Sequence, residues 1–297
     1  SIFFVELAAV TCAGSAATQR LARANTIAMV IVALISPFLG ALADYTSAKK
    51  RFLAFFTLIG ALACIGMFGV GEGEARLAST LFILALVGGT GCVVFYEGLL
   101  PHIAARDEMD RVSTAGYGIG YLGGGLLLAL NLAWVQRPDL FGLPGGTFPA
   151  RLSFVSVGIW WAIFALPLFF KVPEPLRLLE ADEPSAANPM RVAFDRLSET
   201  LRELRGYKQA FLMLVAFLIY NDGIQTIIKM ATAYGTEIGI SQGSLIAAVV
   251  MVQFVGVPFA FLFGRLAGRI GAKPAIFLGL MVYAAISILG FYMTTAK

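Results

Sequence analysis

The sequence predicts an all-α fold, a polytopic transmembrane helical bundle, and three observations support this prediction. Hydrophobic residues make up 59% of the 297 residues and charged residues only 13%, about half the charged share of a typical soluble domain. Apolar runs of about 20 residues recur along the chain without period-two alternation, which favours helices over strands. In hydrocarbon, only helices and closed barrels satisfy all backbone hydrogen bonds.

Windows of about 19 residues predict eight full spans. They cover residues 22–43, 52–71, 77–99, 112–134, 152–172, 209–230, 244–264 and 274–294. Residues 1–13 are also apolar, but at 1.5 Å per residue they reach about 20 Å across a core of about 30 Å. We therefore expect a fragment with about eight full spans plus a partial first span.

The basic residues predict the orientation of these spans. Fifteen of the 22 lysines and arginines fall in alternate loops on one side, at 45–51, 102–111, 171–208 and 265–273. By the positive-inside rule this side is cytoplasmic.

The connection at residues 173–208 predicts a boundary between two helical bundles. Four prolines interrupt its first part, and residues 190–206 then carry Phe194, Leu197, Leu201 and Leu204 at helical spacing. We expect an amphipathic helix that lies on the membrane surface or against the cytoplasmic helix ends. The predicted domains are an N-terminal bundle (1–172), a cytoplasmic linker (173–208) and the start of a C-terminal bundle (209–297).

A short motif occurs twice, each time between one span and the next. The first copy is Gly40-Ala-Leu-Ala-Asp44, followed by Lys49, Lys50 and Arg51. The second copy is Gly264-Arg265-Leu-Ala-Gly268, followed by Arg269, Gly271 and Lys273. A parallel repeat of this kind is typical of transporters built from two related halves.

The first copy resembles the signature between the second and third spans of the major facilitator superfamily, with Ser47 where that motif usually has glycine. Other stretches resemble the vacuolar amino-acid effluxer-like branch, which has many bacterial members. They are Phe95-Tyr-Glu-Gly-Leu-Leu-Pro101, residues 112–124, Tyr220-Asn-Asp-Gly-Ile-Gln-Thr226 and Phe263-Gly-Arg-Leu266. Glu97 departs from the branch, in which asparagine is expected at this position.

This resemblance implies a twelve-span fold and secondary active transport by alternating access. The implied cargo is a small polar solute such as an amino acid. A carboxylate within a span makes protons a candidate coupling ion. The resemblance also implies a multi-pass protein of the bacterial inner membrane, with the lipid bilayer and the solute as its partners.

Asp222 is the leading candidate for binding a proton or substrate. A carboxylate at membrane depth is costly unless it faces a cavity or a partner, so we interpret it as functional, with a structural hydrogen bond as the alternative. Asn221, Gln225 and Lys229 accompany it, and Gln225 and Lys229 share a helix face at i, i+4.

Two further groups lie near the predicted cytoplasmic ends. Glu97 could accept a proton, pair with Arg106 or Arg111, or be a plain interfacial residue. We interpret Asp44 with Lys49, Lys50 and Arg51 as a conformational latch that includes Gly40, with Gly264 and Arg265 as its counterpart in the second copy. An ordinary positive-inside loop would explain the basic residues but not Gly40 or Asp44.

Gly116, Gly120 and Gly124 form a GxxxGxxxG pattern, which predicts close approach to another helix. Gly118 and Gly125 would make the same span easier to bend.

The sequence argues against enzyme, metal and nucleic-acid chemistry. His102 is the single histidine, and no zinc-protease, hydrolase or ATP-binding motif is present, so no catalytic residue, metal site or cofactor is predicted. The basic residues cluster between apolar runs, as orientation requires, rather than in a nucleic-acid-binding patch. The alternatives to solute transport are a lipid or lysolipid flippase of the same fold and a non-transporting scaffold or receptor-like membrane protein.

Overall fold

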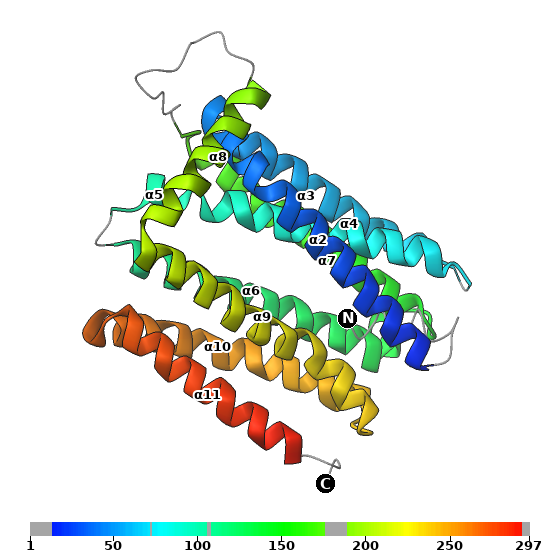
Figure 1. Ribbon diagram of the computed structural model, residues 1–297. Coiled ribbons are helices and arrows are strands. Elements are labelled where there is room, and N and C mark those ends of the chain that lie inside the picture. The colour runs from blue at the N-terminus through cyan, green and yellow to red at the C-terminus, as the bar shows by residue number, and fades with distance from the viewer. Residues whose placement is uncertain (1–13, 72, 106–107, 176–188, 293–297) are drawn as a thin grey trace. The chain divides into compact units, whose positions relative to one another are not determined.

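The computed structural model describes residues 14–71, 73–105, 108–175 and 189–292, and the predicted partial span at 1–13 lies outside them. Eight helices in these ranges are long and apolar enough to cross a membrane, which confirms the predicted spans. They lie in α2 (Gly14–Thr46), α3 (Lys49–Gly66), α4 (Ala75–Glu97), α6 (Met109–Gln136), α7 (Phe148–Lys171), α9 (Lys208–Glu237), α10 (Gln242–Ile270) and α11 (Ala272–Tyr292) (Figure 1). Two short helices, α5 (Leu100–Ile103) and the 3-10 turn η2 (Pro138–Phe141), flank α6.

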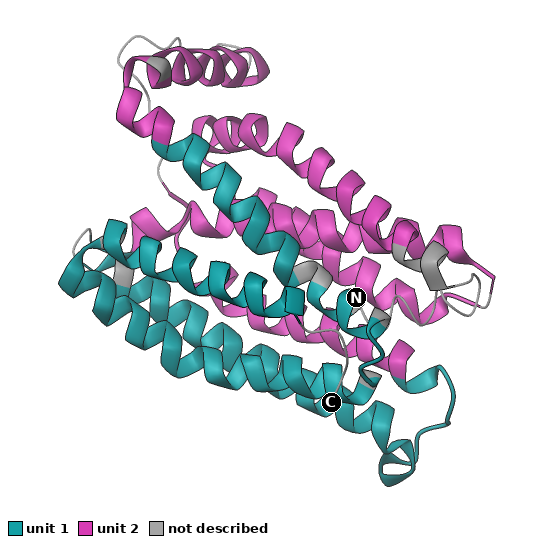
Figure 2. Ribbon diagram, turned by 60° about the horizontal axis from the view of Figure 1, so that its bottom comes forward, with its two compact units in different colours: residues 1–3, 104–149, 213–297 teal, residues 4–103, 150–212 magenta. Residues whose placement is uncertain are grey.

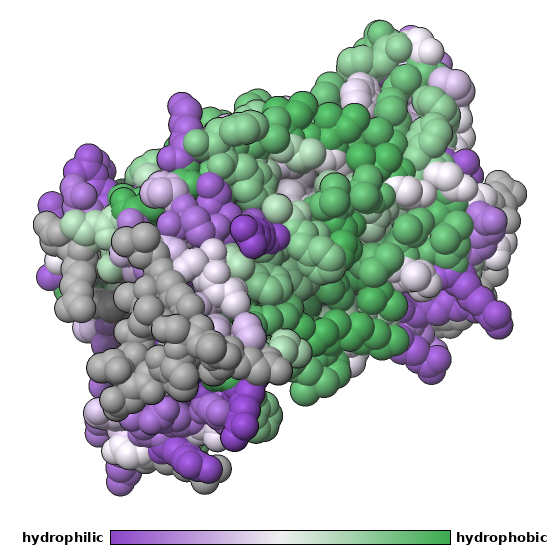
Figure 3. Space-filling view, turned by 90° about the horizontal axis from the view of Figure 1, so that it is seen from above, coloured by the Kyte–Doolittle hydropathy of each residue, from purple (hydrophilic) through white to green (hydrophobic). Residues whose placement is uncertain are grey.

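The predicted amphipathic helix is also present, as α8 (Pro189–Gly206). In Figure 3, hydrophobic residues cover the middle of the helices and hydrophilic residues gather toward their ends. This distribution is the one that a hydrocarbon layer between two aqueous phases requires.

The chain forms two compact units, coloured separately in Figure 2. One contains α2 to α5, α7 and α8, within residues 4–103 and 150–212. The other contains α6, α10, α11 and most of α9, within residues 104–149 and 213–297. The boundary predicted at residues 173–208 separates an N-terminal from a C-terminal helical bundle, and it stays a prediction.

In the first unit, α3 and α4 approach closely because glycines face each other. A Cβ atom added to Gly88 would lie 2.5 Å from the Cα atom of Gly60, and one added to Gly60 would collide with the ring of Trp161 from α7. Beside this contact lies a hydrophobic cluster of Ala43, Leu53, Phe56, Phe95 and Leu99, in which the Phe56 and Phe95 rings stack at 5.7 Å. This packing fixes the ends of α2, α3 and α4 relative to one another.

In the second unit, α6 and α10 run antiparallel and interlock through their own glycines. A Cβ atom added to Gly118 would lie 2.9 Å from the Phe261 ring, and one added to Gly264 would lie 2.9 Å from Thr114. The ring of Tyr121 fills the space beside Gly256 in the same way. Each helix therefore supplies side chains that occupy the gaps left by the glycines of the other.

The glycine stripe predicted on α6 meets α10 at Gly124, where an added Cβ atom would lie 3.4 Å from Nε2 of Gln253, but not at Gly120. A Cβ atom added to Gly120 would meet nothing within 4 Å, whereas Gly118 and Gly125 are buried against α10. The two contact glycines are seven residues apart, so they return to the same face after two helical turns. Gly120 lies on another face of α6.

Helix α8 packs against α2, and its buried residues are Val192 and Ala193. Within the predicted apolar stripe, Leu197 and Leu204 are half-buried, whereas Phe194 is 65% exposed and Leu201 56% exposed. Small residues allow the two helix backbones to approach, whereas the large apolar side chains of α8 point elsewhere.

Candidate functional site at the junction of α2 and α3

The motif at the end of α2 folds into a tight reversal of the chain. Ser47 follows the last residue of α2 with a φ angle of 50°, and among the described non-glycine residues it alone has a positive φ. The backbone N–H of Ala48 donates to the carbonyl of Ala43 at 3.0 Å, which completes a Schellman-type helix end. This conformation explains why the motif usually has glycine where this chain has Ser47.

The second copy of the motif also has a residue of positive φ directly after its helix. Gly271 follows the last residue of α10, occupies the position equivalent to Ser47, and has a φ angle of 86°. Its ψ angle is 157° and its N–H donates to the carbonyl of Ala267, so the two copies share a positive φ angle but not the same helix-end hydrogen bonds.

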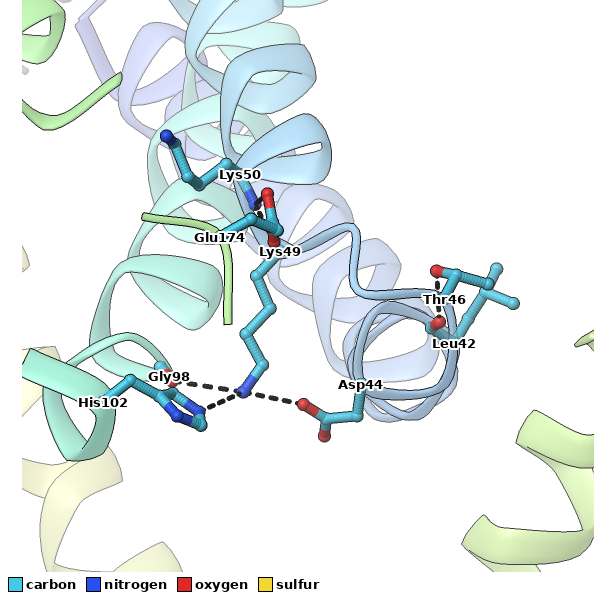
Figure 4. Close-up of polar contacts among 8 residues, drawn as sticks. All are labelled: Leu42, Asp44, Thr46, Lys49, Lys50, Gly98, His102 and Glu174. Carbon is cyan, nitrogen blue, oxygen red and sulfur yellow. Dashed lines mark hydrogen bonds and ion pairs between the residues drawn. The ribbon is translucent and has the colours of Figure 1, made fainter. Parts of the chain in front are cut away.

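The reversal brings Lys49 back to Asp44, and the two form an ion pair at 2.7 Å (Figure 4). The Nζ atom of Lys49 also donates to the carbonyl of Gly98 at 3.2 Å and lies 3.2 Å from Nε2 of His102. Because an ammonium group only donates, Nε2 of His102 is the acceptor in this contact. Lys49 thus joins the end of α2 to the end of α4 and to α5.

Lys50 makes a separate set of contacts with the segment that ends α7. Its Nζ atom donates to the carbonyls of Phe169 and Val172, at 2.9 and 2.5 Å. Its backbone N–H donates to the carboxylate of Glu174, at 3.1 Å to Oε1 and 3.2 Å to Oε2. Lysine at a helix C-terminus and a carboxylate at a helix N-terminus both complement the helix dipole.

Asp44 and Lys49 therefore form one polar cluster with Gly98 and His102, and Lys50 forms a second one with Glu174; we call the two clusters together the latch. The Lys49 side chain is 15% exposed, whereas that of Asp44 is 48% exposed, so water can reach the acidic partner. The contacts of Lys49 and Lys50 are hydrogen bonds between side chains and helix ends, which can break and reform without loss of helix. These contacts join the end of α2, the start of α3 and the ends of α4 and α7.

Four of the predicted gating residues make none of these contacts, and their roles stay predictions. Arg51 is exposed. Gly40 has open space where a Cβ atom would be, so no close contact requires glycine there. Gly264 contacts Thr114 at the α6–α10 interface, and Arg265 beside it is exposed.

Glu97 is the last residue of α4 and is half-buried. It directly precedes Gly98, whose carbonyl accepts a hydrogen bond from Lys49. The sequence-based roles for Glu97, as proton acceptor or as partner of a nearby arginine, stay predictions.

The predicted binding group lies on α9. Asp222 and Gln225 are exposed, Asn221 is half-buried, and Lys229 follows on the same helix. The ring of Tyr220 packs edge-on against Phe217, with centroids 5.4 Å apart, and so fixes the side chain that precedes this group. Asp222, Asn221, Gln225 and Lys229 stay predicted binding residues.

Sequence reasoning did not identify Gly98, His102 or Glu174 as latch residues. His102 and Glu174 lie 53 and 124 residues from the lysines that they contact, so no local spacing links them. One signal was available for Glu174: it stands between two prolines, immediately after a span and on the same side as Lys49 and Lys50.

Comparison with known proteins identifies the family. A family model described as "Vacuole effluxer Atg22 like" matches residues 21–295. The chain belongs to the Atg22-like family. This family is one of membrane transporters and not of enzymes, and the chain is a multi-pass integral membrane protein. The sequence-based recognition of the major facilitator superfamily and of this branch is confirmed.

Two relatives show how far the likeness extends. An MFS-type transporter named YxiO, from Bacillus subtilis, is 32% identical over 98% of this chain and 68% of its own length. Autophagy-related protein 22-1 from Penicillium rubens is 30% identical over 51% of this chain. The match covers only 26% of that fungal protein's length. No solved structure is significantly similar to the chain.

Proposed function

We propose that this Atg22-like chain is the alternating-access machinery of a secondary active transporter for a small polar solute, with amino acids as the first class of cargo. Protons are the proposed coupling ion. The names of its relatives support this proposal, since they describe an MFS-type transporter and a vacuole effluxer family. The likeness to the Bacillus protein supports a location in a bacterial cell membrane.

The observation that carries the proposal is the contact of Lys49 with both Asp44 and Gly98. An alternating-access transporter needs contacts that are strong in one state and absent in another. A 2.7 Å ion pair with a half-exposed partner meets this need, because its net stabilisation is of the same small size as the gap between two conformational states.

Within this mechanism, Asp222 is the proposed site of proton or cargo binding. Asn221, Gln225 and Lys229 would complete the site around the cargo, and Glu97 is the second carboxylate of interest. A carboxylate in the apolar span of α9 carries a desolvation cost that cargo or proton binding would offset.

Uptake by the full-length protein in proteoliposomes tests this function. Labelled amino acids are offered with and without an imposed pH gradient, and solute exchange is measured in parallel. Asp222→Asn is compared with Asp195→Asn, a matched change on the exposed surface of α8. Loss of uphill uptake with exchange retained supports proton coupling, and loss of both supports a binding role. Normal uphill uptake in Asp222→Asn contradicts both roles and makes Glu97 the next carboxylate to test.

A further inference from the structure

Helix α8 is fixed at two places, each at the level where a membrane span ends. Its last residue, Gly206, is separated by Tyr207 alone from Lys208, the first residue of the next span. Since consecutive Cα atoms are about 3.8 Å apart, the end of α8 lies within about 8 Å of the start of that span.

The N-terminal half of α8 is held at the end of another span. Val192 and Ala193 are buried, and the guanidinium of Arg196 lies 5.5 Å from the centre of the Tyr45 ring. Tyr45 is the penultimate residue of the span Gln19–Thr46. Figure 1 shows α8 passing across this end of α2.

Both fixed points are on the same side of the membrane. Four spans, in α3, α4, α6 and α7, separate the end of α2 from the start of α9, so the chain returns to the side that it left. A helix of 18 residues is about 27 Å long. With both halves held at the boundary, its axis runs along the membrane surface rather than away from it.

The exposed residues of α8 divide into an apolar and a charged face. Met190, Phe194 and Leu201 are 55%, 65% and 56% exposed, and their spacing of four and seven residues places them on one side of the helix. This apolar stripe lies roughly a third of a turn from the residues that contact α2. About 100° around the helix from this stripe, on the side away from α2, lie Arg191 and Asp195, an ion pair at 3.9 Å with both side chains largely exposed.

We propose that the apolar stripe of α8 (Met190, Phe194 and Leu201) is a lipid-docking surface, buried among the upper acyl chains of the adjacent leaflet. An amphipathic helix held parallel to a bilayer places its apolar side between headgroups and acyl chains and leaves its charged side in water. Tyr207, which is 69% exposed at the junction with α9, suits the headgroup level, where tyrosine is enriched. The helix thus uses one face for α2 and another for lipid.

Depth measurements on the full-length protein in phosphatidylcholine vesicles test this surface. Single nitroxide labels replace Phe194 and Leu201, with Asp195 and Glu199 on the charged side as matched control positions in the same helix. Collision with oxygen, which concentrates in lipid, is compared with collision with a water-soluble nickel chelate.

We expect a several-fold higher oxygen-to-nickel ratio at 194 and 201 than at 195 and 199. Equal ratios at all four positions would overturn the proposal, because the stripe would then lie in water. Low collision rates with both reagents at 194 and 201 would also overturn it, because a protein surface would then cover the stripe. The measurement needs no transport activity, so its outcome is separate from that of the proposed function.

Discussion

Lys50 and Glu174 cap each other's helices. The Lys50 side chain caps the C-terminal end of α7, which Glu174 follows, and the Glu174 side chain caps the N-terminal end of α3, which contains Lys50. The backbone N–H of Lys50, in the first turn of α3, donates to the Glu174 carboxylate, while the Lys50 ammonium donates to two carbonyls at the end of α7. Each residue therefore satisfies backbone groups that would otherwise lack a partner at a half-buried helix end. The pair closes α3 against α7 independently of the Asp44–Lys49 contact.

Removing the Lys50 ammonium should destabilise the protein. In Lys50→Met the apolar stem is kept, but the carbonyls of Phe169 and Val172 lose their donor. Hydrogen bonds to charged groups contribute roughly 1.5–3 kcal/mol each, so a clear fall in the thermal unfolding midpoint in detergent is expected. Arg51→Met, at the neighbouring exposed position, is the control and should leave the midpoint unchanged. Equal unfolding midpoints for the two variants would show that Lys50 contributes to the orientation of the chain in the membrane but not to its stability.

Weakening the Asp44–Lys49 pair should shift the balance between transport states. Asp44→Asn removes the charge but retains a hydrogen-bond acceptor, and a half-exposed pair contributes about 0.2–1 kcal/mol. We therefore expect a change of up to about fivefold in the ratio of the two states, with cargo binding retained. Reactivity of a cysteine placed at position 48 measures this ratio. Asp195→Asn on α8 is the control. Unchanged cysteine reactivity in Asp44→Asn would show that the motif sets the orientation of the chain in the membrane and does not affect the balance of states.

Replacing Ser47 by glycine should stabilise the end of α2. A non-glycine residue in the left-handed region costs roughly 1–2 kcal/mol. Glycine avoids this cost, but its greater freedom in the unfolded chain offsets part of the gain in stability. The Ser47 hydroxyl is buried without a hydrogen-bond partner, so its removal costs nothing. Ser47→Gly should raise the unfolding midpoint more than Ser47→Ala, which removes the hydroxyl but keeps the unfavourable φ angle. The reverse order would contradict the left-handed conformation.

Adjacent glycines on α4 should differ sharply when replaced by alanine. In Gly88→Ala the new methyl group would lie 2.5 Å from backbone atoms of Gly60, which cannot rotate away, whereas in Gly89→Ala the nearest atom is 3.8 Å distant, on the Trp161 ring. Overpacking of this kind costs typically 1–3 kcal/mol. Gly88→Ala should therefore unfold at a lower temperature than Gly89→Ala, and similar values would contradict the close contact of α3 with α4.

The spans could be predicted because lipid imposes a length and a polarity on every crossing helix. The Asp44–Lys49 pair could also be predicted from the sequence, since its members are only five residues apart and a reversal of the chain brings them together. The contacts of His102 and Glu174 could not be predicted from the sequence, because only the packing of α3, α4 and α7 brings these residues to the lysines.

Helix faces were the other weak point of sequence reasoning. On α6 the GxxxGxxxG pattern predicted a contact through Gly120, but the sequence contains a second glycine spacing, and Phe261 of α10 occupies the gap at Gly118. On α8 the apolar periodicity left open whether the helix meets the membrane surface or other helix ends, and its fully buried residues are Val192 and Ala193. In a membrane protein the largest apolar side chains can face lipid, so hydrophobicity alone does not select the protein-facing side.

The interlocking of α6 with α10 also has a consequence for biosynthesis. The gaps at Gly118 and Gly125 are filled by Phe261, Gln253 and Phe254, which leave the ribosome more than a hundred residues later. At about 5–20 residues per second, α6 must wait on the order of ten seconds in the bilayer before its partner is made. During that interval the glycine face of α6 lacks the side chains of α10 that fill it in the folded unit. Assembly of this unit is therefore timed by translation, and α6 stays open to wrong partners until α10 is inserted.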